Sequence, residues 1–324
     1  MGKFDIIKKP IERNIDEFIT LFRDSLSNTD GLLAETLSHI LNKNGKLMRP
    51  VLVMLIAKNY GEVSDVTLNG AVGLELLHTA SLVHDDVVDE SLERRGQPSM
   101  NAIYNNKVSI LVGDYILSTA LLCIARTNNT KMVTYLANLG QALSHGEVEQ
   151  LSNIFREEIS EEEYYKIIRQ KTAALFAACA KIGALSADAS ETDIVDAEKF
   201  GEILGTIFQI RDDIFDYYDS ESIGKPTGND MAEGKLTLPV IYALQSTKDE
   251  QMMQYALKVK DGTVSADEIH TLVEFTKRNG GIDYAQKKMD ELRQQALAYI
   301  NKSSKEDIRN SLAAYLDYVI QRSV

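Results

Sequence analysis

Hydrophobic residues recur along the chain at the three- and four-residue spacing of helices rather than at the alternating spacing of strands. The segment 72–89 reads VGLELLHTASLVHDDVVD and the segment 201–216 reads GEILGTIFQIRDDIFD, and both are apolar almost all round. Helices of this kind belong in the middle of a bundle. No proline lies between Pro98 and Pro226, so nothing obliges that interval to break and long helices can fill it.

Start signals for helices are common in the C-terminal half. A hydroxyl residue stands three positions before a glutamate, as in a capping box, at Ser160 with Glu163, Thr247 with Glu250, Ser265 with Glu268, and Ser303 with Glu306. Hairpin dipeptides between alternating runs are absent, and no Ser/Gly/Pro-rich linker divides the chain. We therefore predict an all-α protein in which residues 1–324 form a single domain.

Composition narrows the class of protein. The chain has 324 residues, 44% of them hydrophobic, which is enough for a large core. Its net charge of −13 argues against binding to a nucleic-acid backbone or an anionic lipid surface. The two cysteines, Cys123 and Cys179, are too few for a disulfide framework, so we expect core residues of a cytoplasmic protein. Segment 1–9 lacks an apolar signal region, and no run approaches the roughly 18 apolar residues of a spanning helix, so we expect no membrane anchor.

Both apolar helices end in three aspartates with the same spacing. We name Asp85, Asp86 and Asp89 the first acidic cluster, and Asp212, Asp213 and Asp216 the second acidic cluster. At about 100° per residue, the outer aspartates of each cluster lie about 40° apart, so each cluster fans over one edge of its helix. Such crowded carboxylates need a cation, and oxygen-only ligands suit Mg²⁺, which keeps waters and prefers substrate phosphates. The repeated spacing therefore predicts a metal–diphosphate complex.

Basic residues follow or precede these clusters, where a bound diphosphate would need positive charge. They are Lys46, Arg49, Arg94, Arg95, Lys225 and Lys235. Arginine offers paired contacts to phosphate oxygens and lysine offers a point charge. Each of them alone fits a solvated surface residue, but as a set beside two acidic clusters they favour an anionic substrate.

Six blocks of residues stand in the order and spacing of one enzyme family. The blocks are GKLMRP (45–50), LLHTASLVHDDVVDESLERRGQP (76–98), GD (113–114), KT (171–172), FQIRDDIFD (208–216) and GKPTGNDMAEGKLTLP (224–239). In these blocks the chain resembles the trans-isoprenyl diphosphate synthases, of the medium- to long-chain all-trans polyprenyl synthetase type. The resemblance implies an all-α homodimer in which each chain is one large helical bundle, with both acidic clusters on facing helices of a central cavity.

The resemblance also implies the reaction and the site. The family joins isopentenyl diphosphate head to tail to an allylic diphosphate and releases pyrophosphate, without a protein nucleophile or a side-chain base. The matching positions imply Asp85, Asp89 and Asp212 as main ligands of three Mg²⁺ ions, with Asp86, Asp213 and Asp216 in support. They imply Arg94, Lys171, Lys225 and Lys235 on the allylic diphosphate, and Lys46, Arg49, His78 and Arg95 on isopentenyl diphosphate. Lys171, Thr172 and Gln209 are the implied catalytic residues, the last two facing the carbocation with their oxygens.

Product length follows from the direction of the first apolar helix. If Asp85 holds the diphosphate through its metal ion, the growing hydrocarbon runs along that helix toward the helix N-terminus. It then passes Ser81 and Ala80 and next Leu77. Short-chain members of the family carry an aromatic floor in that first turn, whereas Ala80 and Ser81 leave the way open. We predict products longer than farnesyl, in the C30 to C45 range, with a farnesyl or geranylgeranyl diphosphate synthase as the alternative.

Two features of the sequence remain open. Residues 146–150 read GEVEQ, where farnesyl-type members often carry GQxxD, so this segment departs from the farnesyl-type pattern of diphosphate and magnesium contacts. Gly201 and Gly205 either give room to the product chain or allow helices to pack closely.

Two other functions compete with the synthase prediction. The sequence HDD at His84–Asp86 also resembles the helical HD metal phosphohydrolases, but that reading leaves the second acidic cluster unexplained. We therefore expect His84 to be a packed helix residue. A non-catalytic subunit of a two-component prenyl synthase is the other alternative, although such subunits typically lack the acidic clusters that are intact here.

Overall fold

The structure is a computed structural model that describes residues 3–27, 30–41, 46–94, 97–152, 159–218 and 227–321, the side chains of 3 and of 149–152 excepted. The helices are α1 (Lys3–Lys8), η1 (Lys9–Ile11), α2 (Glu12–Ser27), α3 (Gly31–Leu41), α4 (Met48–Tyr60), α5 (Asp65–Val88), α6 (Met100–Tyr104), α7 (Asn106–Ala125), α8 (Thr130–Ser152), α9 (Glu161–Ile168), the π-helical turn η2 (Arg169–Ala173), α10 (Ala174–Ser186), α11 (Glu191–Phe215), α12 (Asn229–Ala232), α13 (Leu238–Thr247), α14 (Glu250–Lys260), α15 (Ala266–Arg278), α16 (Gly281–Ile300) and α17 (Glu306–Gln321). The strands of the described ranges, β1 (Glu93–Arg94) and β2 (Gln97–Pro98), pair antiparallel. The predicted all-α fold class is therefore confirmed.

The chain divides into two compact units. Unit 1 comprises Met1–Gly140, Leu175–Gly201 and Ser303–Ala314, and unit 2 comprises Gln141–Ala174, Glu202–Lys302 and Tyr315–Val324. The first acidic cluster belongs to unit 1 and the second to unit 2. The single domain that the sequence suggests stays a prediction.

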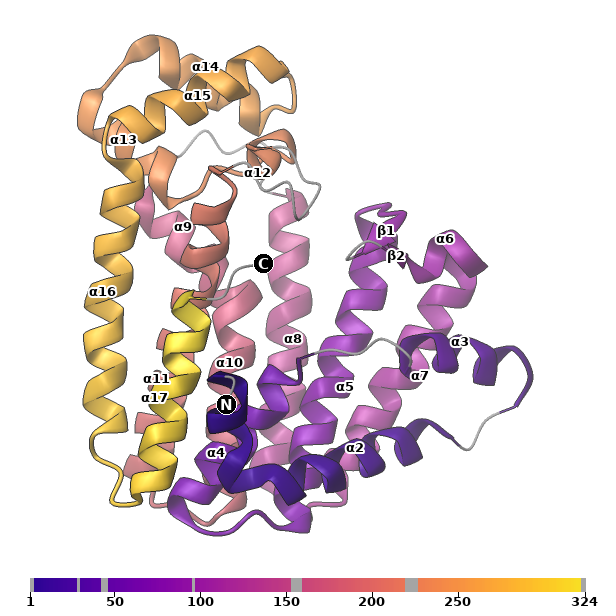
Figure 1. The fold of residues 1–324 in the computed structure, drawn as a ribbon. Coiled ribbons are helices and arrows are strands. Elements are labelled where there is room, and N and C mark those ends of the chain that lie inside the picture. The colour runs from indigo at the N-terminus through magenta and orange to yellow at the C-terminus, as the bar shows by residue number, and fades with distance from the viewer. Residues whose placement is uncertain are drawn as a thin grey trace. The chain divides into compact units, whose positions relative to one another are not determined.

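Unit 1 is built around α5, which packs against α2, α4 and α7 (Figure 1). Residues 51–57 of α4 are all buried, as are most residues of α5 between 67 and 80. Their all-round burial explains why these helices carry no polar face. Cys123 on α7 and Cys179 on α10 are free thiols with no exposed surface, which confirms their prediction as core residues.

Two helices of unit 1 have the length and composition of membrane spans. Within the described ranges these are α5 and α7. They pack against each other, and 67% of the apolar window of α5 is buried in the protein, against 44% for α7. The two helices thus form the core of unit 1, although part of α7 stays exposed.

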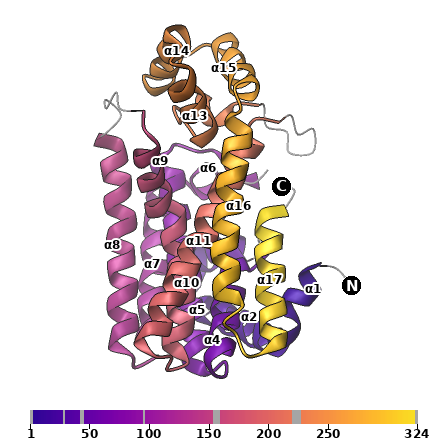
Figure 2. The same ribbon diagram turned by 90° about the vertical axis from the view of Figure 1, so that its left-hand side faces the viewer.

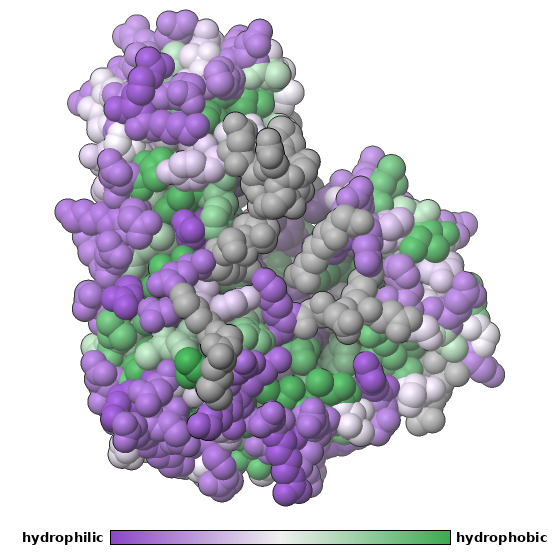
Figure 3. Space-filling view, viewed as in Figure 1, coloured by the Kyte–Doolittle hydropathy of each residue, from purple (hydrophilic) through white to green (hydrophobic). Residues whose placement is uncertain are grey.

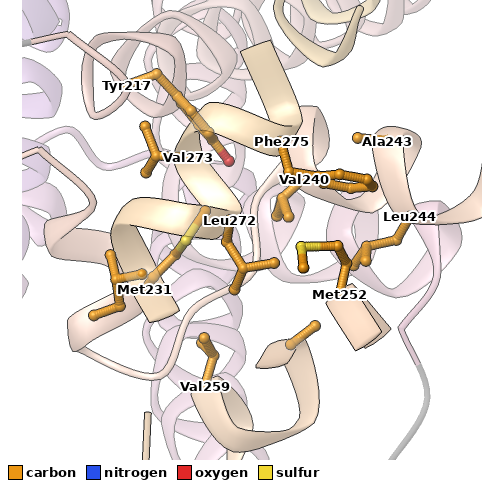
Figure 4. Close-up of a cluster of buried hydrophobic side chains, with 12 residues drawn as sticks. Tyr217, Met231, Val240, Ala243, Leu244, Met252, Val259, Leu272, Val273 and Phe275 are labelled. Atoms are coloured by element: carbon orange, nitrogen blue, oxygen red, sulfur yellow. The ribbon is translucent and has the colours of Figure 1, made fainter. Parts of the chain in front are cut away.

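Unit 2 has its own hydrophobic core at one end of α16. Figures 1 and 2 show α13, α14 and α15 gathered at that end. Met231, Leu244, Met252, Leu272 and Phe275 are among the buried side chains that meet there (Figure 4). The outer surface over α14 and α15 is mostly hydrophilic (Figure 3), as expected for amphipathic helices that cover a core.

Close helix packing explains one of the open glycines. A Cβ added at Gly201 of α11 would lie 2.3 Å from the carbonyl oxygen of Phe176 and 2.7 Å from the Cα of Ala177, both on α10. The backbones of α10 and α11 touch at this point, so Gly201 serves helix packing. Gly205 is buried, and its role stays open.

Two of the four predicted capping residues stand at the start of a helix, and two do not. Ser265 forms a complete box with Glu268, and the Ser160 side chain accepts the backbone N–H of Glu163 at the start of α9. The box at Thr247 is wrong, because α13 ends there and Asp249 caps α14 instead. The box at Ser303 is wrong as well, since α17 begins only at Glu306 and the Ser303 hydroxyl donates to Asn59.

Candidate active site

Each acidic cluster lies at the C-terminal end of a long helix. Helix α5 ends at Val88 with Asp89 as its cap, and α11 ends at Phe215, one residue before Asp216. The backbone dipoles of a helix place a partial negative charge at its C-terminus, and that charge adds to the charge of the carboxylates. Both helix ends therefore attract cations strongly.

The first acidic cluster is divided between one buried and two more accessible carboxylates. Asp86 is only 4% exposed, and its Oδ1 accepts a hydrogen bond from Arg94 Nε at 2.7 Å. The backbone carbonyl of Asp86 also accepts from Asn101 Nδ2 at 3.1 Å. Asp85 is half-buried and Asp89 is exposed. Protein groups thus hold Asp86, while Asp85 and Asp89 lie nearer to solvent.

In the second acidic cluster, Asp216 organises the loop that follows it. Its carboxylate accepts the backbone N–H of Asn229 at 3.0 Å and that of Asp230 at 3.2 Å. Its carbonyl accepts the N–H of Gly228 at 2.9 Å. Gly228 has a φ of +81°, and a Cβ there would lie 2.5 Å from a methyl carbon of Ile269, so the turn requires glycine. The GND sequence is thereby held against the end of α11.

Asp213 lies at the centre of a buried hydrogen-bond chain. Its Oδ2 accepts from the Tyr164 hydroxyl at 2.5 Å, and its Oδ1 accepts from Gln209 Nε2 at 2.8 Å. The Thr172 hydroxyl donates to Gln209 Oε1 at 2.7 Å. Burial raises the pKa of Asp213 to about 7, although the hydrogen bonds from Tyr164 and Gln209 lower it. Tyr164 carries no signal in the sequence, because it is an ordinary apolar position of a helix.

Lys171 and Thr172, which the sequence predicts to be catalytic, lie in the π-helical turn η2. The Ala174 N–H reaches back five residues to the carbonyl of Arg169, which widens the helix here. Such turns often occur at functional sites. Lys171 Nζ lies 2.9 Å from an oxygen of Glu147, which belongs to the segment 146–150 that departs from the family pattern. The glutamate that stands in this segment is therefore an ionic partner of Lys171.

A third group of predicted residues lies in unit 1. Arg49 on α4 approaches Glu75 on α5, with 3.7 Å between Nη1 and Oε2, and both side chains are mostly buried. His78 lies one turn further along α5 and is 8% exposed. Lys46 is exposed just before α4 begins. Glu75 escaped the sequence analysis because one acid in an apolar helix forms no pattern.

Of the three remaining predicted basic residues, the structure describes Lys235. Lys235 Nζ lies 2.5 Å from an oxygen of Glu233, and both side chains are about half exposed. Arg95 and Lys225 lie outside the described residues.

A pocket of about 710 Å³ in unit 2 collects most of the predicted residues of that unit. Its lining includes Lys171, Thr172, Gln209, Asp213 and Lys235. These residues lie as many as 64 positions apart in the sequence, from Lys171 to Lys235, since the KT block, FQIRDDIFD and the loop before α13 each contribute. The fold of unit 2 thus brings cations, carboxylates and neutral oxygen groups to one cavity.

His84 packs against α7. Its Nε2 lies 3.2 Å from the carbonyl of Ile110 and 3.4 Å from an oxygen of Asp114. A Cβ at Gly113 would lie 2.2 Å from that nitrogen, so the GD block makes room for the ring. In the part of the chain that the structure describes, no three His, Cys, Asp or Glu side chains converge to hold a metal ion by themselves. These contacts agree with the prediction that His84 is a packed helix residue.

The residues proposed to control product length lie on α5. Leu77 and Ala80 are buried, and Ser81 is half-buried with its hydroxyl donating to the carbonyl of His78 at 2.9 Å. A Cβ at Gly140 of α8 would meet Leu77 at 3.7 Å. The turn of α5 before Asp85 thus presents small side chains, and the effect on product length stays a prediction.

Comparison with known proteins places the chain among related enzymes. The family model for polyprenyl synthetase matches residues 30–275. An octaprenyl diphosphate synthase of Haemophilus influenzae is 34% identical over 281 residues, which cover 86% of this chain and 85% of the relative. The crystal structure of a geranylgeranyl pyrophosphate synthase from Bacteroides thetaiotaomicron is 48% identical, with 99% and 100% of the two chains covered and a TM-score of 0.88. A polyprenyl synthase from Caulobacter crescentus, in complex with calcium and isoprenyl diphosphate, is 28% identical, with 98% of each chain covered and a TM-score of 0.89.

Proposed function

The chain belongs to the polyprenyl synthetase family, and we propose that it condenses isopentenyl diphosphate head to tail with an allylic diphosphate. The predicted family and the prenyltransferase class are both confirmed by the relatives. The observation that carries the proposal is the pocket of unit 2, where Lys171, Thr172, Gln209 and Lys235 meet beside Asp213. Cations for a diphosphate and neutral oxygens for a carbocation are what this reaction needs at one place.

The carboxylates of the site fit Mg²⁺ as the metal. Oxygen donors at the negative ends of two helices suit a hard divalent cation, and Asp85, Asp89 and Asp212, each more accessible than its buried neighbour Asp86 or Asp213, would serve as main ligands. In this proposal three Mg²⁺ ions bind the allylic diphosphate, and Asp86, Asp213 and Asp216 support them. When bound, Mg²⁺ would stabilise the negative charge that develops on the departing pyrophosphate.

Three basic residues of the proposed diphosphate site are already paired in the structure. Arg94 contacts Asp86, Lys171 contacts Glu147, and Lys235 contacts Glu233. These acidic partners hold the cations in place, so less side-chain entropy is lost when phosphate oxygens bind. Lys225 completes this set in the proposal, and Lys46, Arg49, His78 and Arg95 bind isopentenyl diphosphate.

Thr172 and Gln209 would stabilise the allylic cation. The Thr172 hydroxyl donates a hydrogen bond to Gln209 Oε1. The remaining lone pairs of both oxygens therefore stay available to a positive carbon. The alkene of isopentenyl diphosphate then attacks that carbon, and the released pyrophosphate takes the proton. We therefore assign no side chain as general base.

Product length separates two candidate functions. Ala80 and Ser81 leave the first turn before Asp85 without an aromatic side chain, which supports a product of C30 to C45. A geranylgeranyl product is the second candidate, because the 48% identical structure is named for that length. We propose a cytoplasmic location, since two free, buried cysteines suit a reducing compartment.

The test uses the purified chain with Mg²⁺, isopentenyl diphosphate and farnesyl diphosphate. We expect pyrophosphate release, and chromatography of the dephosphorylated products should show C30 to C45 chains. A C20 product would select the second candidate. Absence of turnover would overturn the enzyme proposal and favour a non-catalytic subunit. Asp212→Asn is the control variant, with turnover expected to fall at least a hundredfold.

We also propose that the chain forms a homodimer through the exposed side of α7. Leu111 and Leu122 are 69% and 60% exposed on this helix, and Ile110 and Leu121 lie beside them. An apolar face of this kind is costly in water and suits a second copy of the chain. Light scattering should show a dimer that Leu111→Lys with Leu122→Lys converts to monomer. Leu92→Lys, at an exposed position outside α7, should leave the dimer intact, and a monomeric wild type would refute the proposal.

A further inference from the structure

A continuous chain of hydrogen bonds lies along the wall of the pocket of unit 2. It begins at the Tyr164 hydroxyl on α9 and passes through Asp213 and Gln209 on α11 to Thr172 in η2. Tyr164 is 5% exposed and Asp213 is 2% exposed, whereas Gln209 and Thr172 are half-buried. All four side chains line the pocket, and Tyr164 and Asp213 are its more buried pair, held by packing.

The chemistry of the groups sets the direction of every bond. One oxygen of the Asp213 carboxyl group already accepts the Tyr164 hydroxyl, and Gln209 turns its Nε2 toward the other. Its Oε1 then faces Thr172, whose hydroxyl donates to it. A Gln209 amide turned by 180° would bring two acceptor oxygens together at Asp213. The position of the Asp213 carboxylate therefore decides which atom of Gln209 faces the pocket.

Tyr164 in turn decides the position of that carboxylate. Its hydroxyl binds Oδ2 at 2.5 Å, which leaves Oδ1 for Gln209. Both oxygens of Asp213 are thus engaged by protein donors. Asp212, the neighbouring aspartate, is half-buried and is the member of the cluster proposed as a main metal ligand.

We propose that Tyr164 is a positioning residue that acts through Asp213 to aim the oxygens of Gln209 and Thr172 at the reacting carbon. Asp213 then supports the metal site indirectly, as an orienting group beside Asp212 rather than as a direct magnesium ligand. This inference rests on the proposed prenyl transfer. The first acidic cluster shows a similar division, because Asp86 is held by Arg94 while Asp85 is more accessible.

Loss of the Tyr164 hydroxyl should affect the chemical step more than substrate binding. Without it the Asp213 carboxylate rotates, Gln209 loses its fixed orientation, and the dipoles no longer point at the developing cation. Removing one direct electrostatic group from an active site lowers kcat by about 10²–10³. Because Tyr164 acts through two other residues, we expect about a tenfold fall in kcat.

The experiment compares Tyr164→Phe with Tyr284→Phe. Tyr284 is a matched control in unit 2, because its hydroxyl also donates to a carboxylate, Glu161, at 2.7 Å. We expect Tyr164→Phe to lower kcat about tenfold with both KM values within about twofold of wild type, and to divert part of the allylic diphosphate to the free alcohol. Tyr284→Phe should leave kcat unchanged. Equal kcat in Tyr164→Phe and wild type, or a change in KM alone, would overturn the proposal.

A second measurement does not depend on turnover and tests the assignment of Asp213, so the proposal can still be overturned if Tyr164→Phe fails to fold. Calorimetric titration with Mn²⁺ in the presence of inorganic pyrophosphate compares Asp213→Asn with Asp212→Asn. We expect Asp213→Asn to bind the metal as wild type does, and Asp212→Asn to bind at least about tenfold more weakly. Equal weakening in the two variants would show that Asp213 is a metal ligand. Wild-type turnover tests the proposed function separately, so the two failures are distinguishable.

Discussion

Gly201 offers the sharpest test of how helix packing supports this protein. Its Gly201→Ala variant adds one methyl group at a point where α11 lies directly on the backbone of α10. That methyl group would sit 2.3 Å from the carbonyl oxygen of Phe176, where about 3.4 Å is an ordinary contact. One helix must therefore move by about 1 Å, because backbone atoms cannot rotate away as a side chain can.

The expected magnitude is a balance of two effects. Overpacking of a dense core costs about 1–3 kcal/mol, and the backbone contact places Gly201→Ala at the upper end of that range. Alanine recovers about 1 kcal/mol through its higher helix propensity. The net loss is about 2 kcal/mol. For 324 residues the unfolding entropy is about 0.7 kcal/mol/K, so the melting temperature should fall by about 3 °C.

Circular dichroism at constant protein concentration measures this change, since the chain has no tryptophan for a fluorescence assay. Gly140→Ala is the matched control in a helix, because its new methyl group would meet only Leu77, at 3.7 Å. That control should gain about 0.5–1 kcal/mol from propensity alone. Unchanged stability of Gly201→Ala together with shorter products would refute the packing argument and assign Gly201 to the product channel.

Other predictions concern binding, product length and thiol chemistry. Glu75→Gln removes the charge beside Arg49, so we expect the KM for isopentenyl diphosphate to rise about tenfold in steady-state kinetics, with kcat little changed; an unchanged KM would contradict a role for this pair. Ser81→Phe should shorten the product in chromatography of the dephosphorylated chains, and equal lengths would count against the proposed route along α5. Burial raises the pKa of Cys179 to about 12, so only about one thiol in 10,000 is ionised at pH 8. Iodoacetamide should therefore label neither cysteine of the folded protein, but both in urea, as judged by mass spectrometry; labelling of the native protein would contradict their burial.

Much of the site was predictable because its chemistry repeats within the sequence. Two DDxxD patterns at the ends of apolar helices predicted both acidic clusters, and the structure places each at the end of α5 or α11. Glu75 and Tyr164 were not predictable. Each is a single residue in an apolar helix. Glu75 matters through its contact with Arg49, 26 positions before it, and Tyr164 through its contact with Asp213, 49 positions after it.

Helix ends show the same limit on a smaller scale. Ser265 caps α15 as its local pattern predicts, whereas Thr247 has the same pattern and fails. The difference comes from the preceding helix, since α13 continues through Thr247 and stops only where Lys248 takes a left-handed backbone conformation. A local pattern cannot indicate whether a neighbouring element already occupies its residues.

The amino-acid sequence by itself determined the helical class and the family, and it predicted the carboxylates and cations of the site, because these depend on periodicity and on the order of residue types. Only the tertiary structure decided which aspartate is buried, which glycine separates two backbones, and which side chains orient Gln209 and Arg49. Those properties arise from contacts between segments far apart along the chain. Burial changes both the hydrogen bonding and the pKa of a carboxylate, and the residues next to it in the sequence do not indicate whether it is buried.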